Sequence, residues 1–406
     1  MKKQHPTILL LGNNSGRNLG DAAILSAILE TVTKEMPDAQ FLVPSIKPQF
    51  IDAHYGAQYN VKGINCMPWT GSLRLFGLPT VAAIARSDAA LICDGIIFGK
   101  GFWNPAFNFL ITLFLLLPFF KLFRCKLVCY NCGIGPFPSA VSRKAARIVM
   151  DGSDLVTLRD EDSKQLAEDI GVTQPLLVTG DSAFTNPVSS DDRAQEILEE
   201  NGIPLDAPLL GINVTVYIDS WLKPEERVAG ADTLLHKIAE AAERLKEAAG
   251  AYPVIFSTQP MDEATSHKLG KMINAPVIDN SRYLSHDIQA VMRRCELLVG
   301  MRFHSLVLAS AVGVPVVGMI YAPKVRGYLR LLRCAEYGLE LQDITSGALF
   351  AKLPKAWSER IQVKTRQQEI VKGLTHGAES AARLLREVIT GESPTVENQT
   401  SCHSVS

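Results

Sequence analysis

Short apolar runs alternate with helical segments along most of this 406-residue chain, and this alternation restricts the possible fold more than any other feature. The runs fall into two sets, and each run has the length of a buried strand. The first set is 7–11, 40–43, 89–93, 126–132, 155–158 and 176–179, and the second is 208–213, 253–258, 276–279, 297–300 and 315–320. Strands separated by helices in this way form parallel sheets that are covered on both faces. The sequence therefore predicts an α/β protein with two doubly wound Rossmann-like domains facing a cleft.

A polar stretch separates the two sets of strands and divides the chain. We expect an N-terminal domain over 1–185, a linker over 186–208 and a C-terminal domain over 209–390. The polar residues 391–406 predict a disordered tail.

Composition argues against several classes of protein. The chain has 41 basic and 42 acidic side chains, and this balance argues against a nucleic-acid-binding protein. Its eight cysteines are too sparse for a disulfide scaffold. The apolar run at 7–11 is too short for the hydrophobic region of a signal peptide. We expect a cytoplasmic protein.

The loop between the first strand and the first helix is rich in glycine and asparagine. Residues 12–20 hold three of each, and Asp21 follows. Glycines let the backbone approach a ligand closely, and the start of a helix favours anions. The loop is neither a Walker loop nor a G-x-G-x-x-G dinucleotide fingerprint. We expect Asn13, Asn18 and Gly20 to bind substrate; a plain turn capped by Asn18 or Asp21 is the alternative.

Basic residues follow two neighbouring predicted strands in the second half of the chain. Arg302 and His304 come after the strand that ends at residue 300, and Lys324 comes after the next strand. Because parallel strands end at one edge of a sheet, we expect these side chains to surround a phosphate or a carboxylate. In the first half, Arg159 and Asp181 also follow predicted strands. Solvated surface charges and a capping histidine are the alternative.

Three cysteines, Cys125, Cys129 and Cys132, have the spacing of a radical-type iron–sulfur site. Such a site needs a loop in which three thiolates converge. Here the cysteines are interleaved with apolar residues, as in a strand whose side chains alternate between two faces. We therefore predict a core strand with Cys125 and Cys129 on one face and Cys132 on the other, and no bound metal.

The segment 101–120 carries no charged residue and is long enough to span a membrane. It lies between two strands of one predicted sheet, however, and Pro118 interrupts it. We predict a crossover helix over 106–123. Peripheral contact of 101–123 with an anionic membrane surface and burial in a homo-oligomer are alternatives. Three basic residues favour the membrane surface: Lys121, Arg124 and Lys126.

With these motifs assembled, the chain resembles the polysaccharide pyruvyl transferase family. The resemblance extends from about residue 7 to about residue 335, and its most specific part is Arg-x-His followed by Tyr-x-x-Lys. The matching motifs are Gly12, Asn18-Leu19-Gly20-Asp21, Gly133-Ile134-Gly135-Pro136, Arg159-Asp160-Glu161-Asp162-Ser163, Thr179-Gly180-Asp181, Met301-Arg302-Phe303-His304-Ser305 and Tyr321-Ala322-Pro323-Lys324. The chain departs from the family at Cys93-Asp94-Gly95, where a run of three glycines is usual.

The resemblance implies a fold similar to that of B-type glycosyltransferases, and phosphoenolpyruvate as the donor substrate, bound on the C-terminal side. The pyruvyl group would be transferred as a ketal to a sugar of a polysaccharide, such as an exopolysaccharide, or of a lipid-linked precursor held on the N-terminal side. No cofactor or metal is implied. Arg159, Arg302 and Lys324 would bind the donor, and His304 would be the general acid. The base would be Asp21 or Asp181.

Two other functions remain as alternatives. A nucleotide-sugar glycosyltransferase of the same fold would need an acidic residue for the ribose in its C-terminal half, and the sequence offers no convincing one. A non-catalytic subunit of a polysaccharide-assembly machine would not need both Arg302 and His304. With a lipid-linked acceptor, the protein would work at the inner face of the cytoplasmic membrane.

Overall fold

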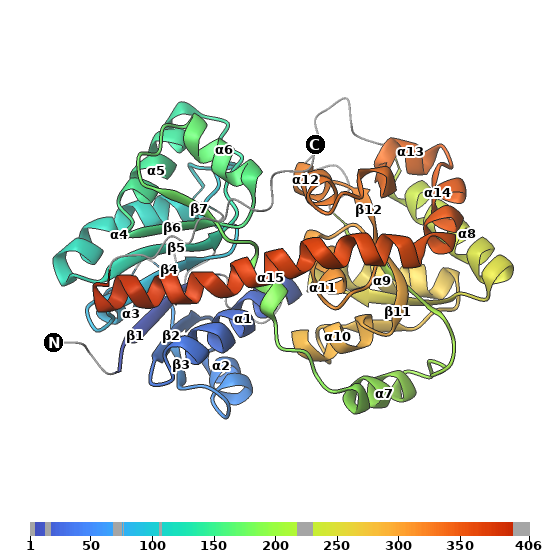
Figure 1. Cartoon of the computed structure of the whole chain (residues 1–406), viewed down its shortest axis with the longest axis horizontal. Coiled ribbons are helices and arrows are strands. Elements are labelled where there is room, and N and C mark those ends of the chain that lie inside the picture. The colour runs from blue at the N-terminus through green and yellow to red at the C-terminus, as the bar shows by residue number, and fades with distance from the viewer. Residues whose placement is uncertain are drawn as a thin grey trace. The chain divides into compact units, whose positions relative to one another are not determined.

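The computed structural model describes residues 5–12, 18–67, 75, 77–104, 108–216 and 230–392. It contains two compact units, each built on one sheet (Figure 1). The first unit comprises residues 1–16, 24–185 and 373–406, and the second comprises 17–23 and 186–372. The strand pairs in both sheets are parallel, so the predicted doubly wound α/β fold is confirmed.

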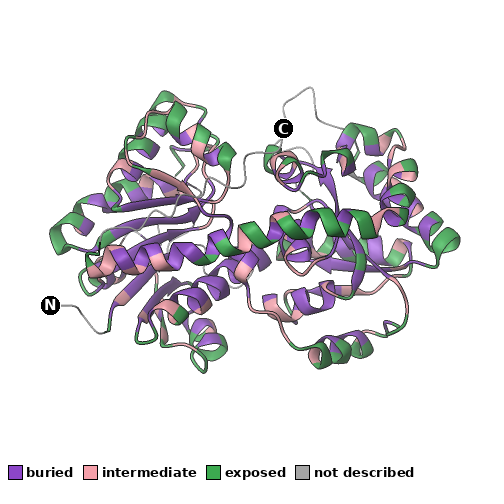
Figure 2. Cartoon of the chain, viewed as in Figure 1, coloured by how far each residue is buried: buried purple, intermediate pink, exposed green. Residues whose placement is uncertain are grey.

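The first unit has a seven-stranded sheet in the order β3-β2-β1-β4-β5-β6-β7. Its strands are β1 (Thr7–Leu11), β2 (Gln40–Ser45), β3 (Val61–Asn65), β4 (Ala89–Cys93), β5 (Lys126–Cys132), β6 (Leu155–Leu158) and β7 (Leu176–Val178). Its helices are α2 (Pro48–Tyr55), α3 (Leu78–Ile84), α4 (Phe109–Phe123), α5 (Ala140–Asp151), α6 (Glu161–Asp169) and most of α1 (Leu19–Glu35). The central strands β1 and β4 are almost wholly buried because helices cover both faces, as Figure 2 shows.

The second unit has a six-stranded sheet in the order β10-β9-β8-β11-β12-β13. Its strands are β8 (Leu209–Asn213), β9 (Tyr252–Ser257), β10 (Val277–Asp279), β11 (Cys295–Gly300), β12 (Val316–Ile320) and β13 (Gly338–Glu340). Its helices include α7 (Asp191–Glu200), α8 (Ala231–Ala249), α9 (Glu263–Met272), α10 (Ser285–Met292), α11 (Phe303–Ala311), α12 (Pro323–Leu331), α13 (Leu341–Thr345) and α14 (Leu349–Ser358). The strand order reverses between β8 and β11, where doubly wound sheets usually bind ligands.

The boundaries of the units differ from those expected in two places. The expected linker, 186–208, is part of the second unit: it contains α7, and the Asn186 amide donates to Gln289 Oε1 at 2.6 Å. The final helix, α15 (Arg360–Thr390), belongs to the second unit up to residue 372 and to the first from residue 373. Most of the expected tail, 393–406, lies outside the described residues.

Helix α4 is the crossover helix that was predicted over 106–123. It begins at Phe109, after Asn108 caps it by accepting from the N–H of Ile111 at 3.3 Å, and it connects β4 to β5. Residues 105–107 lie outside the described part. Within the described residues, we find no helix whose length and hydropathy would suit it to crossing a bilayer.

Strand β5 confirms the predicted core strand but corrects the orientation of Cys132. Asn131 adopts a left-handed conformation with φ 52°, and the register with β6 shifts there. This irregularity turns Cys132 to the same core cluster as Cys125 and Cys129. Cys132 is fully buried and its thiol donates to the Ile92 carbonyl at 3.0 Å. Burial raises the pKa of Cys132 well above its ordinary value and that of Cys125 to about 12, which keeps both thiols protonated.

The last turns of α15 approach the first unit's backbone very closely. A Cβ atom on Gly377 would lie 2.6 Å from the carbonyl oxygen of Thr179. A Cβ on Gly180, whose φ is 90°, would lie 2.7 Å from the carbonyl oxygen of Leu374. Both contacts are with backbone atoms that cannot rotate away. Glycine at 377 and 180 therefore lets the helix rest on the loop that follows β7.

We predict that Gly377→Val lowers the thermal stability. The new side chain would overlap the Thr179 carbonyl, and such overpacking costs about 2 kcal/mol. In a unit of this size the midpoint should fall by roughly 4–8 °C, measured by circular dichroism. Glu379→Val is the matched control, because residue 379 is exposed on the same helix. Equal shifts for the two variants would contradict the close approach.

Candidate functional site

Asn213 holds the carboxyl edge of the second unit's sheet together. It ends β8 and is fully buried. Its Oδ1 accepts from the backbone N–H of Arg302 at 2.9 Å and from the Ser305 hydroxyl at 3.0 Å. Its Nδ2 donates to the carbonyl of Phe256 at 2.9 Å. One amide thus fixes the turn from β11 into α11 relative to β8 and β9.

Arg302 is held by a buried carboxylate. Its Nε and Nη2 donate to the two oxygens of Asp262 at 2.7 and 2.9 Å, and Asp262 is fully buried. The Thr215 hydroxyl and the Val216 N–H also donate to Asp262 Oδ1, at 3.0 and 3.1 Å. Burial by itself would lower the pKa of Arg302, but its hydrogen bonds to Asp262 and the neighbouring Tyr321 raise it. The guanidinium is therefore charged and fixed in orientation.

His304 lies against the start of α1, whose first turn belongs to the second unit. A Cβ atom on Gly20 would overlap the imidazole of His304, so only glycine leaves room for the ring. The N–H of Leu19 donates to the carbonyl of Thr258 at 2.9 Å, which ties this turn to the residue that follows β9. The Asn18 side chain accepts from the Gly20 N–H at 3.0 Å. The start of α1 and His304 thus meet, and Asp21, 6% exposed, follows directly.

Lys324 lies near the same cluster, as its position after β12 predicts. It is exposed in the first turn of α12, and its ammonium nitrogen is 5.8 Å from the centroid of the Phe303 ring. The Phe303 ring and the His304 imidazole also pack in a T-shaped arrangement, with the two centroids 5.1 Å apart. The structure thus brings Arg302, His304 and Lys324 to one edge of one sheet.

The first unit has a second charged cluster at the carboxyl edge of its own sheet. Arg159 follows β6, and its Nε donates to Asp160 at 3.0 Å while its Nη1 lies 3.7 Å from Asp181 Oδ2. A Cβ on Gly133 would overlap the guanidinium, so Arg159 packs directly on the backbone there. Burial would lower the pKa of Arg159, but the carboxylates of Asp160 and Asp181 more than offset it. Asp181 Oδ1 also accepts from the N–H of Ala183 at 2.9 Å.

A buried asparagine also anchors this second cluster. Asn131 Oδ1 accepts from the hydroxyls of Thr157 and Thr179 at 3.1 and 2.6 Å, and its Nδ2 donates to the Ser182 hydroxyl at 3.0 Å. The ends of β5, β6 and β7 are joined by these bonds. The loop that carries Asp181 is therefore fixed relative to the strand that precedes Arg159.

Three further side chains have a geometry that could hold a metal ion. The ligand atoms of Glu263, His267 and Asp279 lie within 4.8 Å of one another. Glu263 and His267 are one turn apart on α9, and Asp279 ends β10. Asp279 Oδ1 already accepts from the N–H groups of Ser281 and Arg282 at 3.0 and 3.2 Å. The sequence did not single out these residues; Glu263 and His267 are four positions apart, but Asp279 is distant in sequence.

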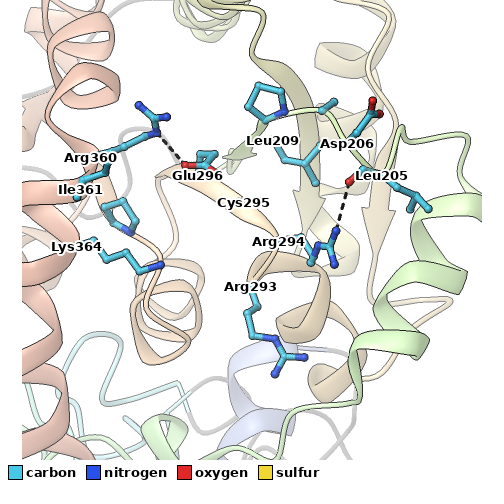
Figure 3. Close-up of a pocket in the computed structure, with 13 residues that line it drawn as sticks. Leu205, Asp206, Leu209, Arg293, Arg294, Cys295, Glu296, Arg360, Ile361 and Lys364 are labelled. Atoms are coloured by element: carbon cyan, nitrogen blue, oxygen red, sulfur yellow. Dashed lines mark hydrogen bonds and ion pairs between the residues drawn. The ribbon is translucent and has the colours of Figure 1, made fainter.

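A cavity of about 430 Å³ lies at the opposite, amino edge of the second sheet (Figure 3). It adjoins Leu209 and Cys295, the first residues of β8 and β11. Arg294 donates there to the carbonyl of Leu205 at 3.3 Å, and Arg360 pairs with Glu296 at 2.9 Å. Both arginines thus bond to other groups of the protein. The cavity is separate from Arg302 and His304, which follow the opposite, carboxyl end of β11.

The sequence placed most charged residues of the two clusters at strand ends, as the structure does, but it did not indicate the groups that hold them. Asn13 lies outside the described residues, so its predicted role has no structural account. Asp262 and Asn213 were not predicted, although each follows or ends a predicted strand, as the catalytic candidates do. A buried polar residue at the end of an apolar strand was the available signal.

A family model and a curated relative both match this chain over most of its length. The sequence model of polysaccharide pyruvyl transferases matches residues 18–323. The amylovoran biosynthesis protein AmsJ of Erwinia amylovora is 22% identical over an alignment of 389 residues, and the alignment covers 85% of this chain and 91% of that protein. The matched region includes Asp21, Arg159, Asp181 and His304 and ends one residue before Lys324.

Solved structures resemble the chain in fold. The UDP-GlcNAc 2-epimerase of Neisseria meningitidis, bound to UDP-GlcNAc, has a TM-score of 0.57 at 13% identity, with 95% of this chain and 99% of that chain covered. A UGT transferase of Siraitia grosvenorii, in complex with UDP, has a TM-score of 0.55 at 11% identity, with the same coverage. The predicted similarity to the B-type glycosyltransferase fold is confirmed.

We predict that Asp262→Ala is strongly destabilising. It would leave the largely buried Arg302 guanidinium without its carboxylate, a change that typically costs about 3–5 kcal/mol. Urea denaturation measures the loss. The control is Glu340→Ala, which removes a carboxylate from an equally bidentate but half-exposed pair with Arg326. That change should cost less than about 1 kcal/mol. A similar cost for both would show that burial does not strengthen the Asp262 pair.

Proposed function

The chain belongs to the polysaccharide pyruvyl transferase family, and from this we propose that it transfers a pyruvyl group from phosphoenolpyruvate to a sugar as a ketal, releasing phosphate. The observation that carries the proposal is the placement of Arg302, His304 and Lys324 at one sheet edge. The donor has a phosphate and a carboxylate, and a site for it needs fixed cations next to a group that can move a proton.

The reaction requires one carbon protonation and two additions of oxygen to the same carbon. A proton adds to the methylene carbon of phosphoenolpyruvate, and one sugar hydroxyl attacks C2. The C2–O bond to phosphate then breaks, and a second hydroxyl of the sugar attacks C2 to close the ketal. Of the two protons lost by the hydroxyls, one balances the new methyl group and the other leaves with phosphate.

His304 is the proposed general acid. Imidazole exchanges a proton near neutral pH, whereas guanidinium and ammonium groups hold theirs much more tightly. The ring is held between Gly20 and Phe303 in one orientation. A fixed orientation matters because the proton must be delivered to one face of the donor's double bond.

Arg302 and Lys324 have different proposed roles. The Asp262 carboxylate balances the charge of Arg302, so this pair orients an anion without adding net charge. Lys324 supplies the net positive charge at this edge and is exposed, which suits a group that meets an incoming phosphate. The start of α11 adds the partial positive charge of a helix N-terminus. Asn18 and Gly20 shape the same edge.

Of the two candidate bases, we assign the role to Asp21. It directly follows Gly20, which contacts His304 in the same unit. Asp181 instead caps the turn at Ala183 and lies beside Arg159, so we assign it to orienting that arginine. Arg159 is proposed as a further substrate-binding cation. We propose no cofactor or metal for the reaction.

The proposed acceptor is a sugar of a polysaccharide or of its lipid-linked precursor. The Erwinia relative is named for amylovoran biosynthesis, which supports a role in exopolysaccharide formation. A lipid-linked acceptor would place the reaction at the inner face of the cytoplasmic membrane. Phosphate release from phosphoenolpyruvate in the presence of lipid-linked and nitrophenyl sugars tests the activity directly.

We predict that phosphoenolpyruvate raises the melting temperature and that UDP-sugars do not. A ligand that binds only the native state stabilises it by about 2.7 kcal/mol at one hundred times its Kd. Differential scanning fluorimetry measures the shift. Stabilisation by a UDP-sugar alone would favour a glycosyltransferase instead.

We predict that His304→Ala lowers kcat by roughly 10²–10⁴-fold, because the proton donor is lost, while donor binding changes little. His236→Ala, an exposed histidine on α8 of the same unit, is the control and should retain full activity. If the loss in His304→Ala appears only in the donor KM, the residue binds the donor rather than protonating it.

A further inference from the structure

The outward face of α4 is apolar, whereas the outward face of an ordinary surface helix is polar. Phe114, Leu115 and Leu122 are 38%, 46% and 69% exposed. Together with Ile111, Pro118 and Phe119 they follow a spacing of three or four residues and share one side of the helix. The opposite side, including Leu113 and Leu116, is buried in the core. A helix that packs on a sheet normally turns polar residues to water.

Helix α5 continues this surface. It packs against α4, and its exposed residues Val141 and Ile148, which are 47% and 38% exposed, lie two turns apart on one face with Lys144 between them. Figure 2 shows exposed residues along the outer sides of both helices. We call these outward residues of α4 and α5, with their flanking cations, the α4/α5 surface.

The sequence segment that forms this surface carries charges of one sign only. Residues 96–150 contain seven lysines and arginines and no aspartate or glutamate, whereas the rest of the chain has 34 basic and 42 acidic residues. Lys126 pairs with Asp154, which precedes β6, and Arg147 pairs with Asp151, the last residue of α5. Among the described residues of 96–150, four other exposed cations form no ion pair: Lys121, Arg124, Arg143 and Lys144.

The exposed apolar side chains and the cations together favour a bilayer surface over a protein partner as what covers the α4/α5 surface. Helix α4 has 15 residues and would span about 22 Å, which is less than the roughly 30 Å hydrocarbon core, and it is held between β4 and β5. A protein partner would explain the apolar side chains but not the absence of acidic residues from 96–150. An anionic bilayer meets both, because acyl chains accept the apolar groups and phosphate head groups attract the cations.

We propose that the α4/α5 surface docks the protein onto an anionic lipid bilayer, with α4 lying in the plane of the interface. The apolar side chains enter the boundary between head groups and acyl chains, and Lys121 and Lys144 contact lipid phosphates. Docking does not depend on the transferase reaction. It would bring the protein to the membrane in which a lipid-linked acceptor resides.

Flotation of the full chain with vesicles tests the proposal. The protein should float with phosphatidylcholine vesicles that contain phosphatidylglycerol and remain at the bottom with phosphatidylcholine alone. Raising the salt from 0.1 M to 1 M should release it, because the Debye length falls from about 10 Å to about 3 Å.

Two double variants separate the apolar and electrostatic contributions. Lys121→Glu/Lys144→Glu should weaken binding by about 25-fold or more, since each cation near an anionic surface contributes a factor of about five. Leu115→Ser/Leu122→Ser should weaken it by about tenfold or more. All four residues are at the surface, so both variants should keep the wild-type melting temperature.

Matched controls lie in the second unit. Ile361→Ser changes an apolar side chain that is 70% exposed, and Lys246→Glu reverses an exposed charge on α8. Neither should affect flotation. Phosphate release with a water-soluble acceptor should be unchanged in all these variants, which keeps this test separate from that of the reaction.

The proposal is overturned if the protein does not bind phosphatidylglycerol vesicles at either salt concentration, or if the controls weaken binding as much as the α4/α5 variants. A second result would also overturn it: light scattering shows a dimer of the wild-type protein, Leu115→Ser/Leu122→Ser dissociates this dimer, and the protein does not bind vesicles. That result would identify the surface as a contact between two copies of the chain.

Discussion

The strand order reverses between the paired strands β8 and β11, and beyond the last paired residues the side-chain amide of Asn213 replaces the hydrogen bonds of the sheet. At such a point the helices that follow the two strands leave on opposite faces of the sheet, so backbone groups at the strand ends lose their regular partners. Asn213 satisfies the N–H of Arg302 and the carbonyl of Phe256 at once. The start of α11, and with it His304, is placed by this one side chain.

The two units solve the problem of holding a cation at a sheet edge in the same way. In each, a guanidinium is paired with a buried carboxylate: Arg302 with Asp262, and Arg159 with Asp181. In each, a glycine removes the side chain that would obstruct a functional group. Gly20 makes room for His304 in the second unit, and Gly133 makes room for Arg159 in the first. Burying the pairs costs desolvation, and the dense hydrogen bonding around them offsets that cost.

Apolar runs in the sequence were sufficient to predict the buried strands, because a strand covered on both faces has no polar alternation to obscure it. The edge strands β3 and β13 were missed: β3 includes the exposed Lys62, and β13 has only three residues. The predicted orientation of Cys132 was wrong because Asn131, in a left-handed conformation, interrupts the alternation of side chains between the two faces of β5. Among site residues, Arg302 and His304 were predictable from their place after a strand. Asp262 and Asn213 hydrogen-bond to Arg302, which is 40 and 89 positions away in the sequence. Only the register of the strands brings them next to Arg302.

The chain passes between its two units four times, because the start of α1 is part of the second unit and the end of α15 is part of the first. Neither unit is therefore a continuous stretch of polypeptide. A single exchange of gene segments at residue 185 would separate Gly20 from the histidine it accommodates and would remove Gly377 from the loop it rests on. Relatives with different specificities could trade units only through several simultaneous crossovers. In this architecture, new specificity is more accessible through substitutions within a unit than through the shuffling of halves.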